Sequence, residues 1–480
     1  MDTIQAFINH PLFYWSLVIL YVFSIVSTIV IILSENRNPV KSLAWLTILI
    51  LLPLVGLILY FFFGRNIKNT RMISRRNKRK LKKNDIQWKI DYNTLEVNLS
   101  TESIQQIKLT HSLTGALFYP GNAVKIFSNG KEKFEELEKD LLTATKYIHI
   151  QYYIFESDKI GNHIKDILIK KATEGVKVRV IYDHIGSIHV KKRFINDMRN
   201  AGIEIFPFFK VAFPPFATRI NWRNHRKLCI IDGEIGYIGG MNIADRYING
   251  IKSGVWRDCH MRIIGPAIRT LQYSFAVDWS FMGQPLIEEE INAISNIENV
   301  GLQMATSGPT SQWPNIAFIF LKSITNAKKR IYIQTPYFLP TENLLKALQS
   351  AALSKVDVRI MIPRRPDSII MRHASFSYIQ ECLNSGIKIY LYQAGMLHSK
   401  TMIIDDEFCT IGSTNFDFRS FEHNFEGNMF IYSKAINKKM IDIFNNDLTQ
   451  SIRINSARWR KRPIFDKALA SILRLLSPIL

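Results

Sequence analysis

The sequence HRKLCIIDG occupies residues 225–233, and HSKTMIIDD occupies residues 398–406. Both follow the pattern H-x-K-x4-D, and each is followed by a pair of small residues and an Asn that lies 17 residues after the His. These trailing segments read GGMN at 239–242 and GSTN at 412–415. One copy alone would be weak, because a His on a strand is usually structural. Two copies with the same spacing indicate a repeated functional unit.

The repetition extends outward from the two motifs. Strands that alternate with helices at this spacing predict α/β layers in each half of the chain. The expected fold is therefore α/β, with two fused lobes related by an approximate two-fold. The matching segments are the strands 147–153 and 331–337, the helices 160–173 and 342–354, the strands 176–182 and 356–362, and the strands 202–206 and 386–390.

The His and Lys of each motif are the first candidate catalytic residues. On a strand, residues i and i+2 face the same way, so His225 is expected beside Lys227 and His398 beside Lys400. An ammonium can bind the nonbridging oxygens of a phosphate, while an imidazole can attack phosphorus or move a proton. The pattern therefore favours phosphate chemistry.

The Asp and Asn of each copy complete the candidate site. Asp232 and Asp405 end the two motifs at predicted hairpin turns, where we expect them to shape the turn and not to contact substrate. Asn242 and Asn415 lie next to small residues, which allows an amide and backbone N–H groups to approach a phosphate closely.

One site shared by both halves is the economical interpretation. One His would then form a covalent phosphohistidine, and the other would protonate the leaving alcohol and later deprotonate the incoming one. Two successive displacements at phosphorus retain configuration and require neither a metal nor a cofactor.

Composition excludes several other classes. The 480 residues include 62 Lys and Arg against 40 Asp and Glu, a formal charge of +22, and 47% are hydrophobic. This balance excludes a disordered chain. The cysteines show no CxxC pairing, so neither a disulfide framework nor a zinc module is expected. They are Cys229, Cys259, Cys382 and Cys409.

Two uncharged runs precede the repeats, at residues 12–33 and 42–63. Each would extend about 33 Å as a helix, enough to cross a bilayer core. A cleaved signal peptide fits poorly, since the chain starts Met1-Asp2-Thr3 without a basic segment. Residues 65–83 hold ten basic residues and no acidic one, which places that side of the membrane in the cytoplasm. Anionic lipid headgroups suit this cluster better than nucleic acid does.

The predicted organisation has five parts. The last of them, a basic amphipathic tail at residues 456–480, could lie in the membrane interface or form an ordinary packed terminal helix. The parts are a two-span transmembrane anchor (1–64), a polybasic juxtamembrane linker (65–105), a first lobe (106–300), a second lobe (301–455) and the tail (456–480).

The paired motifs resemble the phospholipase D superfamily, and the whole chain is similar to the bacterial cardiolipin synthases. Supporting stretches include ENRNP at 35–39, RINWRN at 219–224, QTPYF at 334–338 and GSTNFDFRS at 412–420. The resemblance implies two phospholipase D-like lobes and a reaction in which two phosphatidylglycerol molecules give cardiolipin and glycerol. The uncharged runs and the basic cluster predict a multi-pass cell-membrane protein whose lobes face the cytoplasm and whose partner is an anionic membrane surface, not a nucleic acid.

The resemblance also implies residue roles. In this superfamily an acidic residue downstream of each motif holds the second nitrogen of the His. Glu426 matches that position for His398, and Asp258 matches it for His225. Such a partner fixes the tautomer and stabilises the imidazolium. The family pattern makes His225 the nucleophile and His398 the acid and base, although the nearly symmetric residues leave this order open.

Four alternatives stay open on the residues alone. Three use the same chemistry: a phosphatidylserine synthase, a hydrolytic phospholipase D and a nuclease. The fourth is a membrane scaffold without catalysis. The modest charge of the lobes disfavours a nuclease, and intact His and Lys residues in both copies disfavour a scaffold.

Overall fold

The computed structural model describes residues 11–34, 39–60, 71–83, 99–210, 221–287, 289, 291, 297–475 and 477. Predictions that concern the end of the second uncharged run, Arg65 and Lys68, most of the linker, residues 219–220 and the last three residues lie outside this range. The chain divides into two compact units, Met1–Ile67 with Val211–Asn221 and Lys68–Lys210 with Trp222–Leu480.

The N-terminal unit contains helices α2 (Pro11–Ser34), α3 (Pro39–Leu51) and α4 (Pro53–Leu59). The second uncharged run is interrupted at Leu52 (φ −135°, ψ 67°), because the residue before a proline is disfavoured in helical conformation. Within the described ranges, no helix combines the length and hydropathy that a bilayer crossing requires. The structure therefore does not show the two predicted transmembrane helices.

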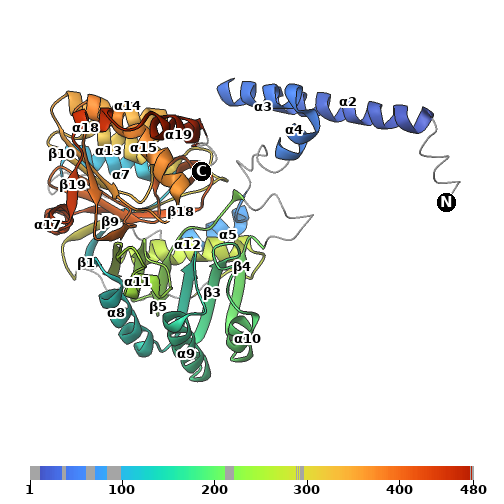
Figure 1. Ribbon diagram of the computed structural model, residues 1–480. Coiled ribbons are helices and arrows are strands. Elements are labelled where there is room, and N and C mark those ends of the chain that lie inside the picture. Colours follow the sequence, from blue (N-terminus) through green and yellow to red (C-terminus); the bar gives the residue numbers. More distant parts are fainter. Residues whose placement is uncertain are drawn as a thin grey trace. The chain divides into compact units, whose positions relative to one another are not determined.

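The larger unit is built on one 15-stranded mixed sheet (Figure 1). In sheet order the strands are β4 (Glu204–Phe208), β3 (Lys177–Asp183), β2 (Tyr147–Tyr152), β5 (Leu228–Ile231), β6 (Ile235–Gly239), β8 (His260–Ile264), β1 (Tyr119–Phe127), β9 (Val300–Ser307), β18 (Glu426–Tyr432), β16 (Phe408–Gly412), β15 (Thr401–Ile404), β10 (Arg330–Gln334), β12 (Asp357–Pro363), β13 (Lys388–Tyr392) and β19 (Ser451–Arg453).

The strand order repeats outward from the centre, where β1 pairs with β9. On one side follow β8, β6, β5, β2, β3 and β4, and on the other β18, β16, β15, β10, β12 and β13. In both halves the last three of these strands are parallel and the others antiparallel. The predicted α/β repeat is confirmed, and both copies share a single sheet.

Helices cover the sheet in three hydrophobic cores. The first half buries α8, α9 and α10, the second half buries α7, α13, α14 and α15, and α12 and α17 share a central core with strands of both halves. The helices of this unit are α5 (Arg75–Lys83), α7 (Thr101–Thr114), α8 (Gly130–Thr143), α9 (Lys159–Thr173), α10 (Lys192–Asn200), α11 (Arg246–Asn249), α12 (Ile268–Phe281), α13 (Asn315–Asn326), α14 (Glu342–Leu353), α15 (Ile369–Asn384), α16 (Phe418–Glu422), α17 (Lys434–Thr449), α18 (Ser456–Arg460) and α19 (Ile464–Leu475).

Two short strand pairs lie outside the main sheet. β7 (Val255–Arg257) pairs in parallel with β14 (Gly395–Leu397), and β11 (Phe338–Leu339) pairs with β17 (Phe416–Asp417). A single parallel bridge also joins Asn224 to Phe425. The β7–β14 pair and this bridge connect the two halves directly beside the two motifs.

The tail forms a helix that packs on the second half. In α19, Arg474 Nη2 lies 2.9 Å from a carboxylate oxygen of Glu381 on α15. Ile464, Phe465 and Leu475 nevertheless stay exposed. Of the two predicted arrangements of the tail, the packed helix is therefore present, and it keeps an apolar surface.

Candidate active site

Each motif His lies just before a strand of the main sheet, beside a segment from the other half of the chain. The amide of His225 donates to the carbonyl oxygen of Phe425 at 2.9 Å, and the amide of His398 donates to that of Arg257 at 2.7 Å. The strands begin only afterwards, at Leu228 and Thr401. The prediction that each His–Lys pair lies within a strand is wrong, because these backbones pair with the opposite half.

His225 is held by a buried glutamate. Its Nδ1 lies 3.0 and 3.2 Å from the two carboxylate oxygens of Glu426 and 2.9 Å from the carbonyl oxygen of Ser413. The hydroxyl of Ser413 and the amide of Asn424 also donate to Glu426. The imidazole is 11% exposed and the carboxylate is fully buried, so the other ring nitrogen is the one available to a substrate.

His398 is held in the same way by Asp258. Its Nδ1 lies 2.7 Å from Oδ2 of Asp258, while Oδ1 accepts the amide of Cys259 at 2.7 Å. The ammonium of Lys400 lies 2.6 Å from Nδ1 and 3.1 Å from Nε2 of the same ring. The imidazole is 10% exposed, and its carboxylate partner is fully buried.

These acid–base pairs cross between the halves, which corrects the expected pairing. The resemblance assigned Glu426 to His398 and Asp258 to His225, and the structure shows the reverse. The bridge at Phe425 leaves the next residue, Glu426, beside His225. Likewise β14 pairs with β7, and Asp258 directly follows β7.

Burial dominates the electrostatics of both motifs, since charged groups are disfavoured away from water. Burial lowers the pKa of His225, and it lowers the pKa of His398 to about 4. It also lowers the pKa of Lys227 well below its usual value and that of Lys400 to about 8. Both imidazoles are therefore neutral near pH 7 before a substrate arrives.

The two motifs also act on each other. After burial, the carboxylate of Glu426 is the largest influence on the pKa of Lys227 and raises it, while the ammonium of Lys400 lowers it. For Lys400, burial comes first, and Asp258 and Glu426 then raise the pKa. Charged groups of each half therefore influence the motif lysine of the other half.

The Asp of each motif binds backbone amides at a turn. The carboxylate of Asp232 accepts the backbone amides of residues 145–147 at 2.7–2.8 Å. That of Asp405 accepts the amides of residues 328–330 at 2.7–3.2 Å. Both residues have positive φ, 54° and 47°. The two carboxylates therefore fix the entries to β2 and β10, as expected for turn-shaping residues.

The two Asn residues differ. Oδ1 of Asn242 accepts the amide of Ile154 at 3.1 Å, and Nδ2 donates to the hydroxyl of Tyr247 at 2.7 Å. The side-chain oxygen of Asn415 is buried without a hydrogen-bond partner among the described residues. Asn242 is thus committed to the protein, and a phosphate contact by Asn415 stays a prediction.

Aromatic rings that sequence reasoning missed pack on both imidazoles. Tyr153 lies edge-on to His225 with 4.9 Å between ring centroids, and Trp256 lies 5.2 Å from His398. The ammonium of Lys227 is 5.4 Å from the Tyr153 ring. Sequence position gave a signal for both rings, because Tyr153 closes a repeated strand segment and Trp256 lies two residues before Asp258.

The chemistry of the site is that of side chains. Within the part of the chain that the structure describes, no group of three or more His, Cys, Asp or Glu residues is arranged to hold a metal. Two imidazoles with buried carboxylates, beside two lysines, can carry out nucleophilic and acid–base steps at an anionic phosphorus centre.

Comparison with known proteins agrees with this site. A family model described as "Cardiolipin synthase, PLD-like domain" matches residues 137–253 and 320–448. The major cardiolipin synthase of Bacillus subtilis is 38% identical over 96% of this chain and 98% of its own. The chain belongs to the cardiolipin synthase family. A second model, the phospholipase D-nuclease N-terminal region, matches residues 19–65.

Other members of the cardiolipin synthase family are equally similar. The cardiolipin synthase of Halalkalibacterium halodurans is 40% identical over 97% of this chain and 95% of its own, and that of Staphylococcus aureus strain Mu50 is 38% identical over 96% and 95%. Among solved structures, a phosphatidylserine synthase of Haemophilus influenzae has a TM-score of 0.59 at 12% identity, covering 78% of this chain and all of that one. This last likeness concerns the fold alone.

Proposed function

We propose that this chain is a cardiolipin synthase, which converts two phosphatidylglycerol molecules into cardiolipin and glycerol. The observation that carries the proposal is the pair of imidazoles, each bound through Nδ1 to a buried carboxylate from the opposite half. Full-length similarity to cardiolipin synthases supports the choice of substrate. The enzyme class is a phosphatidyltransferase.

His225 is the nucleophile in this proposal, and His398 is the acid and base. In the first step Nε2 of His225 bonds to phosphorus, the bond from phosphorus to the terminal glycerol breaks, and His398 gives that glycerol oxygen a proton. In the second step His398 takes the proton of a second phosphatidylglycerol hydroxyl, whose oxygen bonds to phosphorus as the N–P bond breaks. The neutral His225 of the free protein suits nucleophilic attack.

The lysines complete the reaction site. Lys227 and Lys400 bind the nonbridging oxygens of the phosphodiester and offset its charge as the oxygens crowd in the transition state. A bound phosphodiester also brings a negative charge toward His398. That charge raises the low pKa of the imidazole toward the range in which it can carry the proton for the leaving group.

Membrane attachment supplies the lipid substrates. In this proposal residues 1–64 hold the chain in the cell membrane through two spans, and the lobes lie on the cytoplasmic side. The uncharged runs at 12–33 and 42–63 and the basic residues 65–83 support this arrangement. Arg75 and Arg76 on α5 are exposed and follow the second uncharged run closely in sequence, which suits an anionic membrane surface better than a nucleic acid. Retention in the membrane pellet after alkaline carbonate extraction would test the anchor.

Purified full-length chain, incubated with phosphatidylglycerol in mixed micelles without metal or nucleotide, tests the reaction. Cardiolipin and glycerol in equal amounts are expected. Phosphatidic acid would identify a hydrolase, a requirement for a cytidine nucleotide-activated lipid would identify a serine-type synthase, and the absence of any product would favour a scaffold. A phosphoenzyme trapped in His398→Ala but not in His225→Ala would support the assigned order, and the opposite result would reverse it.

A further inference from the structure

A buried ion pair lies behind the His225 half of the site. Arg226, which lies between His225 and Lys227 in the sequence, is buried, and its Nη1 contacts both carboxylate oxygens of Asp278 at 2.6 Å. Its Nε donates to the backbone carbonyl oxygen of Glu426 at 3.1 Å. Asp278, on α12, also accepts the side-chain amide of Gln151 at 2.6 Å. The arginine thus connects a helix to the backbone of the acid that holds His225.

A second buried pair does the same behind His398. Arg257 donates through Nε and Nη2 to the two carboxylate oxygens of Asp447, on α17, at 3.0 and 2.9 Å. Its Nη1 donates to the backbone carbonyl oxygen of Asp258 at 2.7 Å. Asp447 accepts the side-chain amide of Gln334 at 2.7 Å. Each arrangement consists of a Gln on a strand, an Asp on a helix, and an Arg that binds the backbone carbonyl of the acid that orients the imidazole. We call this arrangement a brace.

The two braces make the same contacts, but their arginines occupy different positions in the repeat. Arg226 belongs to a His motif, and the matching position of the second motif is Ser399, whose buried hydroxyl has no partner among the described residues. Arg257 precedes an orienting acid, and the matching position in the other half is Phe425. An arginine is therefore present at both sites although the duplicated sequence does not repeat it, which indicates a requirement of the site itself.

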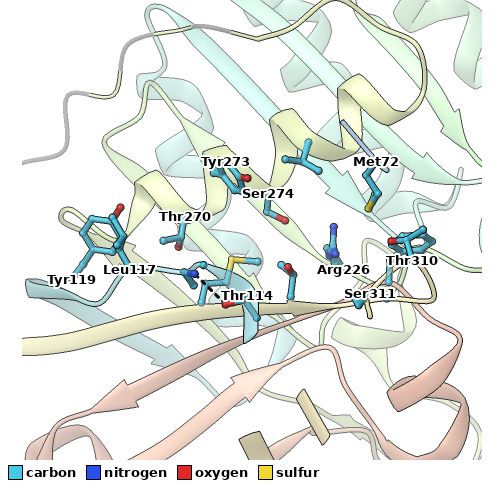
Figure 2. A pocket seen from close by; sticks show the side chains of 17 residues that line it. Met72, Thr114, Leu117, Tyr119, Arg226, Thr270, Tyr273, Ser274, Thr310 and Ser311 are labelled. Atoms are coloured by element: carbon cyan, nitrogen blue, oxygen red, sulfur yellow. Dashed lines mark hydrogen bonds between the residues drawn. The ribbon is translucent and has the colours of Figure 1, made fainter. Parts of the chain in front are cut away.

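A cavity lies beside the first arginine. Arg226 lines a cavity of about 120 Å³ whose wall includes Ser274, one turn before Asp278 on α12, as well as Met304 and Phe425 (Figure 2). Figure 2 shows Arg226 beside this open space. At the wall of this space the guanidinium contacts Asp278 and the carbonyl oxygens of Glu426 and Ser307, and it lies 5.8 Å from the centre of the Phe425 ring.

We propose that Asp278 and Asp447 are positioning residues that hold, through Arg226 and Arg257, the carboxylates of Glu426 and Asp258 against the catalytic imidazoles. This inference deepens the proposed function and rests on it. Outer contacts of this kind matter because a carboxylate must stay aligned with the ring nitrogen to fix its tautomer and its proton affinity. Neither Asp contacts the substrate in this scheme.

The test uses full-length Asp278→Asn and a double variant, Arg226→Met with Asp278→Asn, in which the amide oxygen of residue 278 can still accept the side-chain amides of Gln151 and Asn224. The single variant leaves a buried guanidinium without its partner and is expected to lose both stability and activity. The double variant removes both charges, so its thermal stability should recover while turnover stays about 10- to 100-fold below wild type with KM little changed. The matched control is Asp140→Asn, which breaks the bidentate Arg262–Asp140 pair away from the site and should leave turnover per folded molecule unchanged.

A second readout does not depend on the substrate. The pH at which diethyl pyrocarbonate modifies His225, followed by mass spectrometry, should move down by about one unit in the double variant, because a displaced Glu426 no longer favours the protonated ring. An unchanged midpoint together with recovered turnover would overturn the proposal and leave the pair a folding role only. If the wild type forms no cardiolipin, the proposed function is wrong. The pH midpoint of His225 modification would then still show whether the brace positions Glu426.

Discussion

Gly240 and Ser413 occupy matching positions after the two motifs, and the neighbouring carboxylates explain why they differ. A Cβ built on Gly240 would lie 2.1 Å from Oδ1 of Asp258. Ser413 has room for its side chain, whose hydroxyl donates to Glu426 and accepts the amide of Gly427 at 3.0 Å. The first position therefore requires the absence of a side chain, and the second uses one.

Substitution at these two positions should have unequal effects. Gly240→Ala pushes Asp258 away from His398, and a displacement near 1 Å in a catalytic group can cost about 100-fold in kcat. Ser413→Ala removes one hydrogen bond to a charged group and should cost about 10-fold. Phosphatidylglycerol turnover by folded protein measures both. Equal activity of Gly240→Ala and wild type would contradict this account of the glycine.

The pH dependence of substrate capture should follow Lys400. Its folded-state pKa is lowered to about 8, mainly by burial, so the ammonium is charged below that pH and neutral above it. Because the neutral amine no longer attracts a phosphodiester, kcat/KM should fall as the pH rises through about 8. Lys400→Arg keeps its charge throughout this range, so its residual activity should lack this alkaline decline. A wild-type profile that stays flat to pH 10 would exclude the assignment.

At the scale of elements, Asp232 and Asp405 can be compared directly, because the carboxylate of each accepts backbone amides at the entry to a strand. Asp232 is buried at 7% exposure, whereas the contacts of Asp405 with residues 328 and 329 lie in exposed positions. Asp232→Ala leaves one buried and two partly buried amides without an acceptor and should lower the free energy of unfolding by about 1–3 kcal/mol, with a smaller loss for Asp405→Ala. Urea unfolding measures this difference. Turnover per folded molecule should stay near wild type, and a selective loss of turnover would instead assign the Asp a catalytic role.

Sequence predicted the main elements well because their patterns are local. The expected strand 147–153 is β2, and the expected helix 160–173 is α9 within one residue. The strand assignment failed at His225, since its backbone pairs with Phe425 and not with the next sheet strand. No local pattern reports such a partner, because alternation and turn signals describe a segment by itself.

At the scale of the whole molecule, the repeat predicted the duplicated strand order, while the crossed carboxylates required the three-dimensional structure. His225 and Glu426 are 201 residues apart, and His398 and Asp258 are 140 apart. Their presence in the site was implied by the family resemblance, which places an acidic residue downstream of each motif. Their pairing could not, because it depends on bridges between the halves. The braces were missed for the same reason.

The crossing makes a prediction about the chain as a unit. Asp258 belongs to the first half of the sequence, yet Asp258→Asn should resemble a His398 variant, because the ring it orients belongs to the second half. In the proposed order, its phosphoenzyme should form and then persist, since the step that activates the incoming hydroxyl is impaired. Glu426→Gln should instead resemble a His225 variant and form little phosphoenzyme.

Rapid quenching with phosphatidylglycerol labelled in the phosphatidyl group distinguishes these outcomes, since bound label reports the intermediate and free cardiolipin reports its transfer. Each carboxamide keeps the size of the acid it replaces, so a difference between the variants reflects the lost charge and its hydrogen bond. In a double variant with the matching His→Ala, the acid substitution should add little further loss of activity, because both changes disable the same His–carboxylate pair. If Asp258→Asn behaved like His225→Ala, each half would act with its own acid during turnover, and the crossed arrangement would not be the catalytic one.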